Sequence, residues 1–232
     1  PTSGLVADGS RTPEWDAQFR RAVEIAYGEH QLLVGPRYGV SWLDEYFLTD
    51  SPGPARSRRG SEGGGSALLP ASVNPGREIL GPGEHPFASR YARRYPTMPC
   101  EPSIYLAALM RDVLDFGGRI EVRAFDAPSD LMSLPEMLIV NCTGLGARAL
   151  FGDESLIPIK GQLTVLVPQA EVTYSLGTML PRSDGIVLGH VMQRGVWSLE
   201  HDEEERQRVV DFHMRLFGEM RMPDPRARSA IP

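Results

Sequence analysis

Apolar side chains recur at two different spacings along the chain, and these spacings predict helices and strands in turn. Helical spacing follows Thr12, Ser103 and Asp202, and each of these residues is a good N-cap. Gly35-Pro36 ends the first of the three predicted amphipathic helices and Gly117-Gly118 ends the second. The pattern therefore predicts three helices, one near each end of the chain and one near its middle.

Other segments are rich in β-branched and aromatic residues, alternate in polarity, or form short apolar runs, as strands do. These segments are Val40–Leu48, Arg119–Phe125, Met137–Val140, Gln162–Val167, Thr173–Leu180 and Gly185–Gln193. The sequence Pro181–Gly185 predicts a hairpin turn and hence an antiparallel run. Ser51–Ser66 reads as a loop, and Ala67–Tyr95 as irregular chain.

The most informative stretch is Met137–Leu150, which reads as an apolar strand, a tight glycine turn and the start of a helix. With Arg119–Phe125 it predicts a βαβ-like layout with a parallel sheet buried on both faces. Gly144-x-Gly146-x-x-Ala149 matches a dinucleotide fingerprint, but Gly161–Ala170 lacks the acidic residue that an NAD site needs. A ligand-binding turn and a plain glycine turn remain equal alternatives on this pattern alone.

Composition narrows the class of protein. Of 232 residues, 41% are hydrophobic and 23% charged, as in globular domains, and the net charge of −6 argues against nucleic acid or anionic membranes as partners. No apolar run is long enough to cross a membrane. Two cysteines and five histidines show no metal-ligand spacing, and no G-x-S-x-G elbow occurs. The pattern indicates a small-molecule partner, no metal and no single catalytic side chain.

Three short motifs occur in order along the chain and are followed by Trp197-Ser198. They are Val140–Ala147 (V-N-C-T-G-L-G-A), Pro158–Gln162 (P-I-K-G-Q) and Gly185–His190 (G-I-V-L-G-H). Together they resemble the D-amino-acid oxidase family of flavoproteins over about Pro99–Phe217. The resemblance implies FAD and the oxidative deamination of D-amino acids, with dioxygen reduced to hydrogen peroxide. It also implies a mixed α/β fold, with part of an FAD-binding parallel sheet and an antiparallel-sheet substrate domain.

The resemblance assigns site residues by position. The implied cofactor-binding residues are Val122, Cys142, Thr143 and Gly144. The implied substrate-binding residues are Tyr174, Thr178 and His190, where Thr178 replaces a tyrosine of the family and His190 a glycine. Ordinary strand and turn roles for these residues stay open as alternatives.

The resemblance also implies a division of the chain. The expected parts are a substrate-domain portion at 1–98, an FAD-domain portion at 99–158, antiparallel substrate-domain strands at 159–200, a helix at 201–221 and a disordered tail at 222–232.

Two family motifs do not occur in the chain: the N-terminal G-x-G-x-x-G strand and the G-x-R-P-x-R segment with its carboxylate-binding arginine. Both are expected upstream of Pro1, in which case this chain alone is inactive. The alternatives are a related flavin oxidase of glycine, sarcosine or D-aspartate, and an inactive fragment or non-catalytic binding module. The cytoplasm is the expected compartment unless an upstream targeting segment exists, and the oligomeric state is undecided.

Overall fold

The computed structural model describes residues 11–52, 70–73, 76, 78–189 and 191–220. His190, the tail from Met222 and most of the Ser51–Ser66 loop lie outside these residues. The helices are α1 (Pro13–Leu32), α3 (Pro102–Asp115), α4 (Gly146–Phe151) and α5 (Glu203–Gly218), with short 3₁₀ turns η3 (Ala71–Val73) and η4 (Pro128–Ser133). The strands are β1 (Leu43–Thr49), β2 (Glu78–Leu80), β3 (Tyr91–Thr97), β4 (Ile159–Lys160), β5 (Thr164–Leu166), β6 (Tyr174–Leu176), β7 (Met179–Arg182), β8 (Gly185–Leu188) and β9 (Gln193–Arg194).

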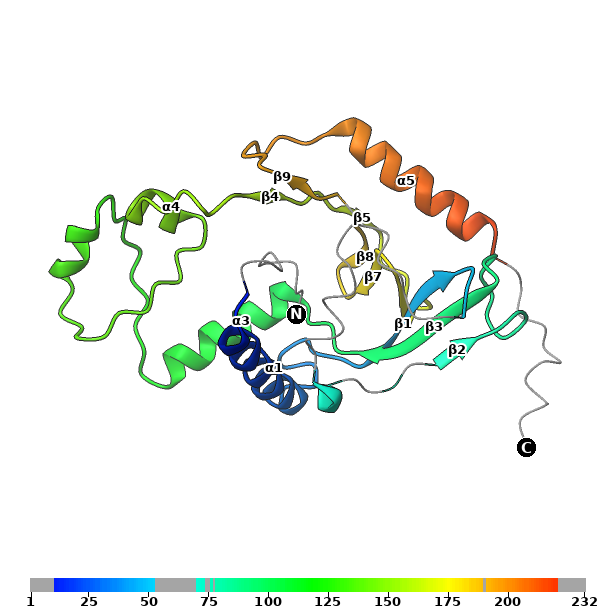
Figure 1. Cartoon of the computed structure of the whole chain (residues 1–232), viewed down its shortest axis with the longest axis horizontal. Helices are drawn as coiled ribbons and strands as arrows, with labels where there is room; N and C mark the ends of the chain where they lie inside the picture. The colour runs from blue at the N-terminus through cyan, green and yellow to red at the C-terminus, as the bar shows by residue number, and fades with distance from the viewer. Residues whose placement is uncertain (1–10, 53–69, 74–75, 77, 190, 221–232) are drawn as a thin grey trace.

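Seven of the strands form one sheet in the order β2-β3-β1-β6-β7-β8-β5, and β4 pairs with β9 in a small second sheet. Within the large sheet only β1 and β6 run parallel, and every other pair is antiparallel. Figure 1 shows α5 along this sheet, and α4 with its flanking loops at the other end of the molecule. The expectation of a mixed fold of helices and strands is confirmed.

The principal core lies between the sheet and α5. Leu176, Met179, Ile186 and Leu188 come from β6, β7 and β8 and are buried against Val209 of α5. Burying such side chains stabilises the fold by roughly 1.5–3 kcal/mol each, so this cluster holds α5 on the sheet. The aromatic rings of three further residues extend the cluster toward β1: Tyr46, Phe87 and Tyr174.

Two of the three predicted N-caps, Thr12 and Asp202, are confirmed. The Trp15 N–H donates to Thr12 Oγ1 at 3.2 Å, and the Glu205 N–H donates to Asp202 Oδ1 at 3.0 Å. The prediction of Ser103 as a cap was wrong. The N-cap is Glu101, because Pro102 has the fixed φ that suits the first helical position and lacks the N–H that would need a partner.

The two strands predicted around the central stretch, Arg119–Phe125 and Met137–Val140, are not formed. Their apolar side chains face solvent instead, and those of Val122 and Met137 are fully exposed. A strand forms only where a neighbouring strand pairs with its backbone groups, and none lies beside either segment within the residues described. The predicted parallel sheet is therefore absent from this part of the structure, and among the strands of the described residues one pair is parallel, β1 with β6.

Three other predictions needed correction. Gly185–Gln193 is not one strand, because β8 ends at Leu188 and β9 begins at Gln193. Thr173–Leu180 is not one strand, because Gly177 adopts φ +58° and turns the chain between β6 and β7. The irregular reading of Ala67–Tyr95 missed β2 and most of β3. Charged side chains dilute the apolar pattern there. Arg94 of β3 pairs across the ladder with Glu78 of β2, and such cross-strand pairs support strands without apolar alternation.

Candidate functional site

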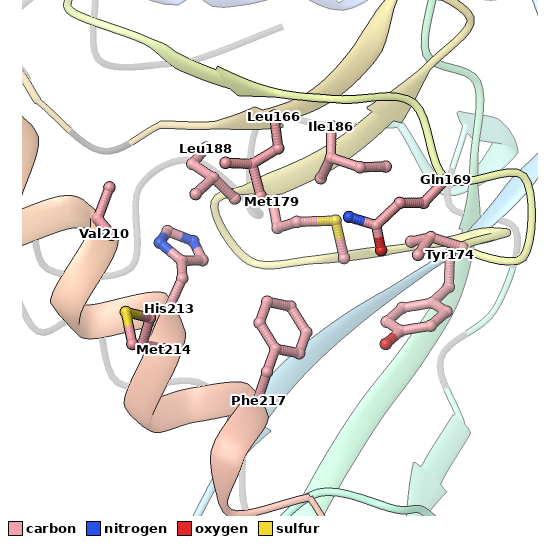
Figure 2. A pocket seen from close by; sticks show the side chains of 11 residues that line it. Leu166, Gln169, Tyr174, Met179, Ile186, Leu188, Val210, His213, Met214 and Phe217 are labelled. Carbon is pink, nitrogen blue, oxygen red and sulfur yellow. The ribbon is translucent and has the colours of Figure 1, made fainter.

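A cavity of about 560 Å³ lies between α5 and the face of the sheet that carries Met179 (Figure 2). Strands β5 to β8 supply one wall, the segment between β5 and β6 supplies another, and α5 closes the third. Its lining residues are Leu166, Gln169, Val172, Tyr174, Met179, Ile186, Leu188, Val210, His213, Met214 and Phe217. A concave, largely apolar space with a few polar groups is typical of small-molecule sites.

Three polar side chains lie in this wall: Gln169, Tyr174 and His213. In Figure 2 the Gln169 amide extends across the cavity toward Met179. Burial raises the pKa of the Tyr174 phenol above its usual range, so Tyr174 remains a neutral hydroxyl at physiological pH. The Tyr174 ring packs edge-to-face on Tyr46, with ring centroids 5.8 Å apart. The predicted substrate-site residue Tyr174 is therefore placed at a cavity.

Thr178, the second predicted substrate-site residue, is half-buried and lies in the turn between β6 and β7. Its Oγ1 is 3.1 Å from Nε2 of His213, and the other ring nitrogen of His213, Nδ1, is 2.8 Å from the Val209 carbonyl oxygen. The Thr178 carbonyl in turn accepts from the Gly189 N–H at 2.8 Å. These hydrogen bonds connect Thr178, a predicted substrate-site residue, to α5.

Sequence reasoning did not select His213. It is buried on α5, whereas its neighbour Phe212 is 48% exposed. A signal was available, because His213 lies four residues after buried Val209 and so shares its helix face.

The predicted cofactor turn is held by its own side chains. Asn141 Oδ1 accepts hydrogen bonds from the Thr143 N–H at 3.1 Å and from the Thr143 hydroxyl at 2.8 Å. Gly144 follows at φ +57°, and a Cβ built there meets no atom within 4 Å. The turn is therefore preformed, exposed and open on the side of Gly144, so that its backbone is accessible to a ligand.

The remaining cofactor-site residues are also exposed. Cys142 is a free, exposed thiol next to the turn, and Val122 lies in the irregular chain before η4. Figure 1 shows this region beside α4, well away from β6 to β8. The structure thus places Tyr174 in the cavity wall and Thr178 in the turn after β6, outside the residues that line the cavity. Cys142, Thr143 and Gly144 lie at the other end, and the structure does not unite the two groups.

Across the described residues, no group of three or more His, Cys, Asp or Glu side chains is placed to hold a metal ion. Within the same part of the chain, no helix combines the length and hydrophobicity needed to cross a bilayer.

Similarity to known proteins is consistent with the sequence motifs. The chain is 32% identical to human D-aspartate oxidase over 127 residues, and 33% identical to D-amino-acid oxidase of Streptomyces coelicolor over 121 residues. These matches cover 52% and 47% of this chain, and 36% of each relative. D-aspartate oxidase 1 of Caenorhabditis elegans is 25% identical over 205 residues, which is 84% of this chain and 58% of that protein.

No protein-family model matches the chain. The chain spans about a third of the length of the human and Streptomyces relatives. The predicted resemblance to the D-amino-acid oxidase family is confirmed by these relatives.

Proposed function

Starting from this similarity to D-amino-acid and D-aspartate oxidases, we propose that the protein takes part in the FAD-dependent oxidative deamination of a D-amino acid. The observation that carries the proposal is that relatives with these names match at 32–33% identity over more than 120 residues. The V-N-C-T-G sequence at Val140–Gly144 supports it, because the structure gives that sequence a preformed turn.

FAD is the proposed cofactor, with Thr143 and Gly144 against one edge of it and Cys142 beside them. The residues present fit such a role, because the turn is exposed and Gly144 carries no side chain that would block a close approach. Val122 would meet the adenine end through its backbone. When bound, FAD would supply the two-electron acceptor for the hydride of the substrate α-carbon and the site at which dioxygen is reduced to hydrogen peroxide.

Tyr174 and Thr178 are the proposed substrate-binding residues, and His190 is kept as a third from its motif. The neutral phenol of Tyr174 can donate or accept one hydrogen bond, and the apolar wall beside it excludes water from the substrate. No side chain of the chain is assigned an acid or base role, because hydride transfer to a flavin needs mainly position and orientation from the protein.

A second candidate is oxidation of D-aspartate, which the names of the human and nematode relatives favour. An acidic side chain needs a cationic partner when it is buried. The cavity lining contains no Lys or Arg. The apolar lining therefore favours a neutral D-amino acid. If the protein binds no flavin, its alternative function is that of a non-catalytic binding module.

The test is the visible absorption spectrum of the full-length protein encoded by the gene that contains this sequence. A flavin band that bleaches anaerobically on addition of a D-amino acid is the expected result. A colourless protein would refute the oxidase proposal.

Thr143→Arg tests the turn itself, because the long side chain projects from an exposed position beside Gly144. We expect it to lower flavin content strongly. The matched control is Ser129→Arg, which makes the same kind of change at an exposed residue of η4. Equal flavin content in the two variants would remove the turn from the cofactor site.

A further inference from the structure

The cavity between α5 and the sheet has a buried apolar floor and an exposed mouth. Met179, Ile186 and Leu188 form the floor and are 1%, 4% and 2% exposed. Gln169 and Met214 also line the cavity but are exposed, so the mouth lies between α5 and the segment that joins β5 to β6. The volume of about 560 Å³ lies within the range of roughly 300–1,000 Å³ that is usual for small-molecule pockets. A small organic molecule can therefore enter at Gln169 and reach the floor.

The lining of the cavity carries no Lys, Arg, Asp or Glu among the described residues. A charged group that leaves water needs an opposite charge or several hydrogen bonds in compensation. An anion or a cation therefore finds no partner of opposite charge in this lining. The same holds for both charges of a free amino acid, its ammonium and its carboxylate.

The polar side chains of the lining differ in what they can offer to a ligand. Both ring nitrogens of His213 are engaged, with Nδ1 2.8 Å from the Val209 carbonyl oxygen and Nε2 3.1 Å from Thr178 Oγ1. The side chains of Gln169 and Tyr174 form no hydrogen bond with the described part of the chain. An amide and a phenol can each donate and accept, so hydrogen-bonding capacity is free at these two residues.

These two residues lie at the same side of the cavity. Figure 2 shows Gln169 and Tyr174 together, with Val210 and Met214 of α5 on the opposite side and Met179 between them. The free hydrogen-bonding groups are thus gathered at one end, and apolar surface fills the rest. This division matches a molecule with one polar end and an apolar body.

We propose that the cavity binds an uncharged, mainly apolar molecule whose one polar group is an alcohol or a primary amide. The polar group lies between Gln169 and Tyr174, and the apolar body lies against the floor. The inference goes beyond the proposed function, because this ligand is not the amino-acid substrate. Since Tyr174 is also a proposed substrate-binding residue, the ligand would compete with the substrate in the full-length protein.

Methionine methyl groups report binding directly in this chain and need no cofactor. Met179 and Met214 line the cavity, whereas Met110 and Met132 are 54% and 86% exposed and lie outside the lining. In ¹H–¹³C NMR spectra, a titration with hexanamide should shift the methyl resonances of Met179 and Met214 and leave those of Met110 and Met132 in place. No shift at Met179, or equal shifts at all four methionines, would overturn the proposal.

Charged probes test the requirement for an uncharged ligand. Hexanoate and hexylammonium have the same length as hexanamide, and D-leucine carries both charges on an apolar side chain. At neutral pH we expect each of them to bind at least about tenfold more weakly than hexanamide, because each would bring an unpaired charge to the lining. Equally strong binding of hexanoate or hexylammonium contradicts the inference. A Met179 shift with D-leucine as large as that with hexanamide does so too, since the cavity would then take the substrate.

Two substitutions with matched controls test the two ends of the cavity. Gln169→Leu removes a hydrogen-bonding partner at the mouth and should weaken hexanamide about fivefold. Its control is Gln18→Leu, at an exposed residue of α1. Val210→Trp adds a large side chain to the α5 wall and should abolish the Met179 shift, whereas Val113→Trp, at an exposed residue of α3, should preserve it.

Unchanged hexanamide binding in Gln169→Leu would overturn the placement of the polar group. This variant changes an exposed residue, so the test holds even if Val210→Trp fails to fold. A colourless full-length protein with the expected hexanamide results refutes only the oxidase activity. A flavin-containing protein in which hexanamide leaves Met179 unshifted refutes only the ligand inferred here.

Discussion

Met179 offers the sharpest test of the packing that forms the cavity. Its side chain is 1% exposed, whereas that of Met214, another methionine in the lining of the same cavity, is 68% exposed. Truncating each to alanine removes the same atoms. The two substitutions therefore differ in burial, and each serves as the matched control for the other.

The magnitude follows from the position of Met179. Truncating a fully buried methionine to alanine costs about 2–5 kcal/mol of unfolding free energy. Met179 already borders an open volume of about 560 Å³, so fewer contacts are lost than in a closed core. We therefore expect about 2–3 kcal/mol for Met179→Ala and less than about 0.5 kcal/mol for Met214→Ala.

Equilibrium unfolding in urea, followed by far-UV circular dichroism, measures both free energies. For a chain of this length the Met179→Ala loss corresponds to a fall in Tm of about 4–12 °C. Equal losses in the two variants, or a loss below about 1 kcal/mol for Met179→Ala, would refute the packing of α5 on the sheet as described here.

Three further predictions concern other parts of the chain. Gly185→Ala should cost on the order of 3 kcal/mol, because the new Cβ would overlap the Leu166 carbonyl oxygen and lie 2.6 Å from Val165 Cγ1. Gly177→Ala, whose Cβ meets nothing within 4 Å, should cost only about 1 kcal/mol. The Glu205 N–H lowers the pKa of Asp202, so the Asp202 charge stabilises the protein above about pH 4 and stops doing so as pH falls through the lowered pKa. Asp202→Asn keeps a cap and removes this dependence, which a series of pH-controlled melts would detect as a smaller loss of Tm in acid. Amides of Arg119–Phe125 should exchange with deuterium within seconds to minutes, and those of β1 far more slowly, because β1 is paired with a strand on each side whereas Arg119–Phe125 is paired with none. Slow exchange throughout Arg119–Phe125 would contradict its description as unpaired chain.

Local signals in the sequence were read correctly where local chemistry decides the structure. Thr12 and Asp202 cap their helices because a side-chain oxygen meets an N–H only three residues away. The Pro181–Gly185 hairpin also formed as predicted, with Arg182 opposite Gly185, because the residues of its turn are adjacent in the chain. Such features depend on a few neighbouring residues, and the sequence contains all of them.

Errors occurred where structure depends on distant partners. β3 was missed because its pairing with β1 and β2 is carried by the backbone and by the pair of Arg94 with Glu78, which lie 16 residues apart. The contact of His213 with Thr178 was missed because the two residues lie 35 positions apart in the sequence. An apolar pattern identifies which elements can form, but it does not tell which one of them will be adjacent in space.

The central stretch shows both behaviours in adjacent residues. Met137–Val140 has the composition of a buried strand, yet it forms no strand and is exposed, because an apolar strand is stable only against partners that cover it. The turn that follows keeps its shape without such partners, since Asn141 Oδ1 accepts from both the N–H and the hydroxyl of Thr143. The conformation of the V-N-C-T-G motif is therefore determined by hydrogen bonds between side chains and backbone groups within the motif. A Thr143→Val variant, which removes one of these two bonds, should loosen the turn while leaving β1 to β8 unchanged, and amide exchange at Gly144 would report it.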